Sequence, residues 1–301
     1  MSMLADCTLC PRMCHANRLV GTGYCGAGSK AKVALVSLHK WEEPVIAGAN
    51  GAGTVFFSGC NLRCLFCQNY EISHQQTGIE ISDERLGEIF YEQQLRGAAT
   101  LDLVTPTHFI PQIINGIIFA QKKGFSLPVV YNSSGYENLG SLDLLHPYVD
   151  VFLPDLKYYS PELSGAYSKA PDYFQVAAGA IKKMVQLTGA AVLEGGLMKR
   201  GVLVRHMVLP GARKDSMKLL SWLWQEFGDS IMVSIMSQYT PTYLAKAHPK
   251  LRRRLTTFEY ESVVDWAREL GFTRCFVQET QSASDEYVPQ WTGEGVERFS
   301  K

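Results

Sequence analysis

From Thr54 onward, short apolar runs alternate with segments of helical length, and this alternation limits the possible folds more than any other feature of the chain. Six runs have the length and side chains typical of buried strands. They cover residues 55–58, 101–105, 129–132, 149–153, 202–208 and 232–236. The helical segments that follow them cover residues 83–96 (behind a Ser82 cap), 111–123, 139–146, 173–187, 214–227 and 260–270.

Strands that alternate with helices indicate an α/β fold in which crossover helices connect parallel strands. Six such units predict a partial (β/α)6 barrel. Residues 1–50 lack this pattern and are rich in Cys and Gly. We therefore expect a small Cys-rich, metal-binding segment over residues 1–50 and a core domain with a C-terminal extension over residues 51–301.

Three cysteines follow the first predicted strand directly, at C-x3-C-x2-C spacing: Cys60, Cys64 and Cys67. Three thiolates at this spacing can surround a [4Fe-4S] cube and bind three of its irons. No fourth cysteine lies nearby in the sequence, so the fourth iron would keep an open site for a substrate or cosubstrate. A zinc ion completed by another residue is the alternative, because sulfur ligands suit either metal.

A second group of cysteines lies near the N-terminus at C-x2-C-x3-C-x10-C spacing: Cys7, Cys10, Cys14 and Cys25. Four thiols within 19 residues form a closed ligand set. They could hold a second [4Fe-4S] cluster or a structural zinc ion. Cys275 stands alone, and we expect it to be buried.

Composition excludes several classes of protein. The 29 basic and 29 acidic side chains balance, so the chain has no general attraction to nucleic acid or to membranes. Its apolar runs are too short to span a bilayer, and its first residues do not resemble a signal peptide. Grouped, unpaired cysteines are typical of metal binding in a reducing compartment, so we expect a cytoplasmic protein.

Polar residues lie at the end of each of the later predicted strands, as in 105–108, 132–136, 154–158, 205–206 and 237–240. Ligands of α/β proteins bind at the carboxyl ends of the strands. Five polar strand ends around one barrel mouth therefore predict a pocket for a cosubstrate.

Two other polar stretches allow more than one interpretation. Residues 39–43 read His-Lys-Trp-Glu-Glu, and they either line the substrate side of the barrel mouth or attach the front segment to the body. Residues 250–254 include Lys250, Arg252, Arg253 and Arg254. They form either a solvated face or a docking site for an acidic flavodoxin or ferredoxin.

With Phe66 before its last cysteine, the triplet motif resembles that of radical S-adenosylmethionine (SAM) enzymes. Along nearly its whole length, from Cys-Pro-Arg at residues 10–12 to Phe-Val-Gln-Glu at 276–279, the chain resembles their glycyl-radical-enzyme-activating branch. The nearest likeness is to the pyruvate formate-lyase activating enzyme-like subgroup. The resemblance implies a barrel of radical SAM type, SAM chelated to the open iron, and flavodoxin or ferredoxin as the reductant.

Some residues depart from the pattern of that family. Its Gly-Gly-Glu motif grips the SAM amino group, and here Thr105-Pro106-Thr107-His108 takes that place. An Asp-Thr pair on the third strand corresponds to Asn132-Ser133. Thr105, Thr107, Asn132 and Ser133 are the cofactor-binding residues that the resemblance implies at these positions.

Other residues match the family more closely. Asp155 and Lys157 match its Asp-x-Lys beside the SAM carboxylate, and Arg205 matches an arginine of the fifth strand. A mobile ammonium and a forked guanidinium both suit a carboxylate, so Lys157 and Arg205 are the expected catalytic residues. An ion pair between Lys157 and Asp155 is the structural alternative. Phe66 and Gln238 complete the expected cofactor-binding set.

The expected function is reductive cleavage of SAM at a [4Fe-4S] cluster, giving a 5'-deoxyadenosyl radical that abstracts hydrogen from a substrate. On the resemblance, that substrate is a glycine of a partner glycyl radical enzyme. One alternative is radical modification of a small molecule, a peptide or an RNA base. The other is a non-catalytic iron-sulfur or zinc module of an electron-transfer or assembly complex.

Overall fold

The computed structural model describes residues 3–278 and 289–297, so Glu279 of the C-terminal motif lies outside the described residues. Within these ranges one sheet has the strand order β10-β9-β8-β6-β5-β4-β2-β1-β3, and β7 pairs with β8. The strands are β1 (Ala31–His39), β2 (Ala52–Phe57), β3 (Ile79–Ile81), β4 (Leu101–Val104), β5 (Val129–Ser133), β6 (Val151–Pro154), β7 (Val192–Glu194), β8 (Leu197–Met207), β9 (Met232–Met236) and β10 (Cys275–Val277).

Helices connect the parallel strands. The α-helices are α1 (Pro44–Ala47), α2 (Tyr70–Ser73), α3 (Asp83–Leu95), α4 (Ile110–Gln121), α5 (Leu139–Leu145), α6 (Pro161–Ser168), α7 (Tyr173–Thr188), α8 (Arg213–Phe227) and α9 (Thr257–Leu270). Short 3-10 turns cover Thr107–Phe109, His146–Tyr148, Gly228–Ser230 and Tyr243–Ala247. The six predicted strands correspond to β2, β4, β5, β6, β8 and β9, and each predicted helix is present.

The predicted α/β fold is confirmed, and its cause is visible in the burial of the strands. Strands β2, β4, β5 and β6 are buried at every position, so both of their faces are covered. This is why they read as continuous apolar runs with little alternation. The strands from β2 to β10 along the sheet pair in parallel, except for the β7–β8 hairpin.

Helix starts follow local capping chemistry. The Ser82 hydroxyl accepts a hydrogen bond from the Arg85 amide at 3.2 Å, which confirms the expected cap of α3. At the start of α9, Thr256 and Glu259 form a reciprocal capping box. These caps satisfy amides that have no partner inside the helix.

Strand β1 was not predicted. It lies within residues 1–50 and pairs antiparallel with both β2 and β3, so this part of the front segment belongs to the main sheet. The β7–β8 hairpin was also missed. Its turn, Gly195-Gly196, has φ of 58° and 80°, values that glycine adopts readily. As a result β8 begins at Leu197, five residues before the expected start at 202.

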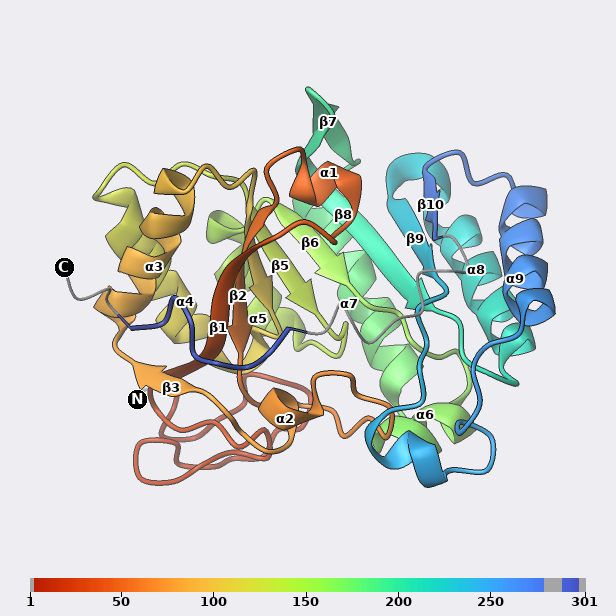
Figure 1. Cartoon of the computed structure of the whole chain (residues 1–301), viewed down its shortest axis with the longest axis horizontal. Helices are drawn as coiled ribbons and strands as arrows, with labels where there is room; N and C mark the ends of the chain where they lie inside the picture. The colour runs from red at the N-terminus through yellow and green to blue at the C-terminus, as the bar shows by residue number, and fades with distance from the viewer. Residues whose placement is uncertain (1–2, 279–288, 298–301) are drawn as a thin grey trace.

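Different segments lie at the two ends of the parallel strands (Figure 1). Helix α1 lies at one end, where its Val45 and Ile46 pack in an apolar cluster with Val130, Leu153 and Leu203 of the strands. Helix α2 and the Cys-rich N-terminal loops lie at the opposite end, toward which β5, β6 and β8 point (Figure 1). The described part of the chain contains no helix long and apolar enough to cross a membrane.

Candidate functional site

A cavity of about 590 Å³ lies at the carboxyl ends of the parallel strands. Side chains from the loop after β2 and from the ends of β4, β5, β6, β8 and β9 line it. The predicted cofactor-binding residues found in this lining are Phe66, Thr105, Asn132, Ser133, Asp155, Lys157, Arg205 and Gln238. The three cysteines of the triplet line the same cavity. The fold therefore brings together residues that lie up to 178 positions apart in the sequence.

The three thiols are each held by a polar neighbour. The Leu62 amide donates to Cys60 Sγ at 3.4 Å, while Ser168 Oγ lies 3.0 Å from Cys64 Sγ and Ser73 Oγ lies 3.1 Å from Cys67 Sγ. Burial, together with the charge of Cys64, raises the pKa of Cys67 to about 11. Burial also raises the pKa of Cys60 and of Cys64.

The thiols of Cys60, Cys64 and Cys67 are the kind of ligand that an iron-sulfur cluster requires. Three soft sulfur ligands face a single cavity, and bound iron would supply the positive charge that buried thiolates need. Among residues 3–278 and 289–297, no three His, Cys, Asp or Glu side chains surround a single ion position. A cube does not require such a position, because each of its cysteines binds a different iron.

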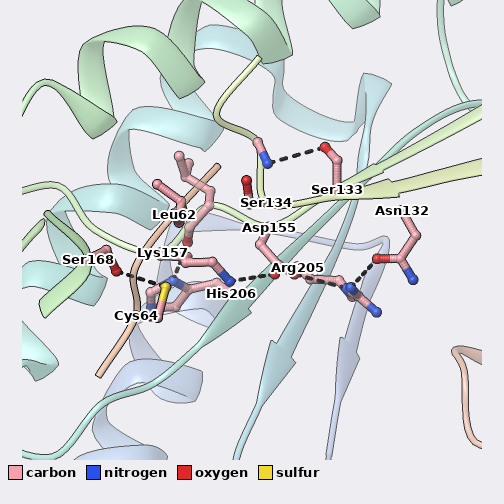
Figure 2. A network of polar contacts seen from close by, with 12 residues as sticks. Leu62, Cys64, Asn132, Ser133, Ser134, Asp155, Lys157, Ser168, Arg205 and His206 are labelled. Atoms are coloured by element: carbon pink, nitrogen blue, oxygen red, sulfur yellow. Dashed lines mark hydrogen bonds and ion pairs between the residues drawn. The ribbon is translucent and has the colours of Figure 1, made fainter. Parts of the chain in front are cut away.

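A row of charged groups extends from the cysteine loop across the cavity (Figure 2). Lys157 Nζ donates to one oxygen of Asp155, and Arg205 Nε donates to the other at 3.1 Å. Burial alone would raise the pKa of Asp155, but the two cations outweigh it and hold that pKa below its ordinary value. The ion pair expected as the structural alternative for Lys157 is thus present.

The guanidinium of Arg205 is largely occupied by protein partners. Besides Asp155, it donates to Glu42 Oε2 at 3.1 Å and to the side-chain oxygen of Asn132. Lys157 has one carboxylate partner, and its ammonium has further protons to donate. Lys157 is therefore better placed than Arg205 to bind an added carboxylate, and Arg205 fixes Asp155 and Asn132.

Thr107 does not line the cavity. Its hydroxyl donates to Glu137 Oε1 at 2.7 Å in a buried cluster that also includes Tyr131. Burial raises the pKa of Glu137 to about 7. His108 is also outside the lining: its Nε2 lies 2.8 Å from the Ser58 carbonyl oxygen, and burial lowers its pKa to about 4.

Thr105 combines a cavity position with an unfavourable backbone conformation. Its φ is +59°, a left-handed value that is rare for a β-branched residue, and its amide donates to the Asn132 carbonyl at 2.9 Å. We expect Thr105→Gly to raise the free energy of unfolding by about 1 kcal/mol, because glycine relieves this strain. Chemical denaturation measures the change.

The neighbouring Thr107 provides the matched control. Its backbone φ is not positive, and its hydroxyl donates a hydrogen bond to the buried carboxylate of Glu137. Thr107→Gly should lower the unfolding free energy by about 2 kcal/mol, since it leaves a buried carboxyl oxygen without a donor. If both substitutions destabilised the protein equally, strain at Thr105 would be refuted.

A buried arginine, Arg18, lies beside the N-terminal cysteines. Cys7, Cys10 and Cys25 are buried and Cys14 is exposed. Arg18 is 1% exposed, and its Nη1 donates to Cys7 Sγ at 3.7 Å.

The other donors of Arg18 reach only backbone oxygens, those of Ala27, Gly28 and His108. No ion pair with a carboxylate is found for Arg18 in the described parts of the chain. A buried guanidinium needs compensating negative charge, which metal-bound thiolates would provide.

The N-terminal segment packs directly against the triplet loop. Arg12 Nε donates to the Asn61 carbonyl at 2.8 Å, and Gln76 Nε2 donates to the Cys25 carbonyl at 2.9 Å. Gly59 has a φ of +93°, and a Cβ there would lie 2.7 Å from the Cys25 carbonyl oxygen. Only glycine allows this close approach next to Cys60.

Comparison of the sequence with known proteins finds a relative but no matching family. No family model matches the chain. An uncharacterised protein of Methanocaldococcus jannaschii is 27% identical over 277 residues, which cover 89% of this chain and 76% of the relative. Because that relative is uncharacterised, the similarity does not indicate an activity.

Solved structures give the architectural comparison. Streptococcus suis SuiB bound to its precursor peptide SuiA matches 73% of this chain with a TM-score of 0.52 and 11% identity. The protein anSMEcpe with bound AdoMet (SAM) matches 73% with a TM-score of 0.50 and 13% identity. The matches cover 46% and 61% of those two chains, so this chain spans about half the length of these proteins. The fold of this chain, α/β with a mostly parallel central sheet, is therefore similar to that of these radical SAM structures. The Cys-rich N-terminus is a feature of this chain's own sequence.

Proposed function

We propose that the chain is a radical SAM enzyme. The observation that carries this proposal is the presence of Cys60, Cys64 and Cys67 in one cavity with Lys157 and Asp155. When bound, a reduced [4Fe-4S] cluster with an open iron supplies the electron that cleaves SAM to methionine and a 5'-deoxyadenosyl radical, which then abstracts hydrogen from the substrate. Flavodoxin or ferredoxin is the proposed electron donor.

The side chains around the cavity have separate roles in this proposal. The three cysteines hold the cluster, and Lys157 binds the SAM carboxylate by a charge-assisted hydrogen bond. Asp155 and Arg205 keep the Lys157 ammonium in place. Phe66 is 5% exposed and packs edge-on against Tyr158 and Tyr239, so it forms a rigid apolar wall of the cavity.

The proposed substrate is a peptide or protein segment. Two of the similar structures were solved with peptides, SuiB with SuiA and anSMEcpe with Cp18Cys peptide, which supports this choice. A glycine in a glycyl radical enzyme is one such segment. Modification of another peptide fits the cavity equally well.

A spectroscopic experiment tests SAM binding at the open iron. The protein is reconstituted anaerobically with iron and sulfide and reduced, and its electron paramagnetic resonance spectrum is recorded with and without SAM. A change on adding SAM is the expected result, because SAM would coordinate the cluster. An unchanged spectrum from a fully loaded cluster would favour a non-catalytic iron-sulfur module.

We also propose that Cys7, Cys10, Cys14 and Cys25 bind a second metal centre, preferentially another [4Fe-4S] cluster. Replacing all four with alanine should lower the iron content of the reconstituted protein by about four atoms per chain, the content of one such cluster. The loss of one zinc atom instead would identify a structural zinc site. Unchanged iron and zinc contents would refute a metal at this position.

A further inference from the structure

A long basic loop, residues 237–256, connects β9 to α9. The 3-10 turn Tyr243–Ala247 is the only helical turn within these described residues. Loops of this length with so little regular structure are uncommon in a compact domain and often carry a function. The basic loop contains no Asp or Glu. Five of its side chains are basic and exposed: Lys246, Lys250, Arg252, Arg253 and Arg254.

The basic loop is attached to the cysteine triplet. The Ala245 amide donates to the Leu65 carbonyl at 2.9 Å, and Leu65 directly follows Cys64. The Tyr243 ring stacks on Tyr70 with 4.8 Å between the ring centroids. Figure 1 shows the basic loop, in blue, at the same end of the sheet as helix α2. The loop therefore adjoins the segment whose thiols would hold the cluster.

Lys169 extends the positive surface to the other side of Leu65. The Leu65 amide donates to the Tyr167 carbonyl at 2.9 Å, and the Tyr167 ring packs edge-on against His248 of the basic loop. Lys169 directly follows α6 and is exposed. Two segments that contact Leu65, the end of α6 and the basic loop, thus both carry exposed cations.

Much of this positive charge has no counterpart within the protein. Three cations of the basic loop form no ion pair with any described residue: Lys246, Lys250 and Arg252. Arg253 pairs with Glu259 at 2.7 Å. The exposed acids of α2, α6 and the turn after α6 are Glu71, Glu162 and Asp172. The six exposed cations outnumber these three acids, so the surface around the triplet is basic.

The basic loop also presents an apolar side chain to solvent. Leu244 is 51% exposed and lies two positions before Lys246. Protein interfaces combine an apolar centre with a polar rim. Nucleic-acid-binding domains usually carry an overall excess of basic charge, whereas this chain has a formal net charge of zero. The basic loop therefore fits an acidic protein better than a nucleic acid.

We propose that the basic loop is the docking surface for an acidic electron-carrier protein. This inference rests on the proposed radical SAM function, which needs an electron from outside the chain, and it specifies where that partner binds. Complementary charge speeds the association of such a partner, and the contact at Leu65 brings it next to the cluster loop. In each encounter the carrier loses one electron and the cluster gains one, so a flavin hydroquinone leaves as the semiquinone.

The test uses the reconstituted protein and two acidic probes, a flavodoxin and a ferredoxin, each in its oxidised form. Binding is measured anaerobically by isothermal titration calorimetry at about 0.05 M and about 0.5 M salt. At least one probe should bind at low salt, and its affinity should fall at least about tenfold at high salt, because salt screens exposed charges. Failure of both probes to bind at low salt would overturn the proposal.

A triple variant locates the binding. The loop variant combines three substitutions that remove exposed positive charge: Lys246→Gln, Lys250→Gln and Arg252→Gln. It should bind the probe at least about tenfold more weakly, since several surface ion pairs are lost together. The control variant removes three exposed cations next to the amino-terminal ends of the strands: Arg96→Gln, Lys122→Gln and Arg200→Gln. It should bind as the wild type does, and equal weakening in both variants would contradict docking at the basic loop.

A nucleic acid is the competing occupant of a basic surface. A mixed-sequence RNA oligonucleotide is therefore titrated into the same proteins. It should bind the wild-type protein more weakly than the better of the two carriers. Tighter binding of the RNA that is lost in the loop variant would identify a nucleic-acid surface and refute the proposal.

Reduction by dithionite separates this proposal from the proposed function. Dithionite needs no docking surface, so the loop variant should cleave SAM with dithionite at the wild-type rate. If the wild-type protein cleaves SAM with dithionite but binds neither carrier, only the docking proposal fails. If a carrier binds at the basic loop but neither reductant supports SAM cleavage, only the proposed function fails.

Discussion

Replacing Cys64 with serine is expected to abolish SAM cleavage. Cys64 is buried, and its Sγ lies 3.0 Å from Ser168 Oγ. The positive charge of Lys157 opposes the rise in the pKa of Cys64 that burial causes. The substitution therefore changes a proposed cluster ligand at the centre of the site. Serine retains the shape and a polar group but is a poor ligand for iron-sulfur clusters. We expect cluster iron at the triplet to fall sharply and the yield of 5'-deoxyadenosine to drop at least about a thousandfold, the scale associated with loss of a whole catalytic unit.

Cys275→Ser is the matched control. Cys275 is half-buried on β10, away from both cysteine groups in the sequence, and it does not line the cavity. Its replacement should leave iron content and SAM cleavage unchanged. A Cys64→Ser protein with full iron content and normal cleavage would exclude the triplet as the cluster site.

The second large effect is expected for Asp155→Asn. This substitution removes the carboxylate that Lys157 and Arg205 share inside the cavity. Breaking a buried ion pair leaves uncompensated charge, so the free energy of unfolding at pH 7 should fall by about 3 kcal/mol. The loss is measured by chemical denaturation.

Asp143→Asn is the control for a surface pair. Asp143 is 54% exposed and lies 2.6 Å from Lys183, so its loss should cost about 0.5 kcal/mol. Equal effects for Asp155→Asn and Asp143→Asn would show that the row of charges is not a buried network.

The effect at Asp155 should also depend on pH. Because the folded-state pKa of Asp155 lies below its unfolded value, its carboxylate stabilises the fold above the unfolded pKa of about 3.9. That stabilisation is lost as the pH falls through the lower folded-state pKa. The difference in stability between wild type and Asp155→Asn should therefore be full at pH 7 and shrink in strong acid.

The repeated strand–helix pattern was enough to predict the six central βα units, because their strands are buried on both faces and their helices are amphipathic. The short edge strands β3 and β10 have three residues each, too few for a recognisable pattern. Strand β1 lies within a Cys- and Gly-rich segment, and its pairing with β2 and β3 depends on contacts between distant residues. Such tertiary pairing has no local signature.

The candidate site could be predicted to a similar extent. Residues at strand ends converge in any such fold, so Asp155, Lys157 and the triplet could be placed together from sequence alone. The ion pair between Arg205 and Glu42 depends on the position of α1, which the local sequence does not indicate.

The central claim is tested most directly by product analysis of SAM turnover. The anaerobically reconstituted protein is incubated with SAM and dithionite, and 5'-deoxyadenosine and methionine are quantified by chromatography beside the Cys64→Ser protein. The proposed function predicts equal amounts of the two products from the wild-type protein and neither from Cys64→Ser. The absence of both products from a wild-type protein with a fully loaded cluster would contradict it.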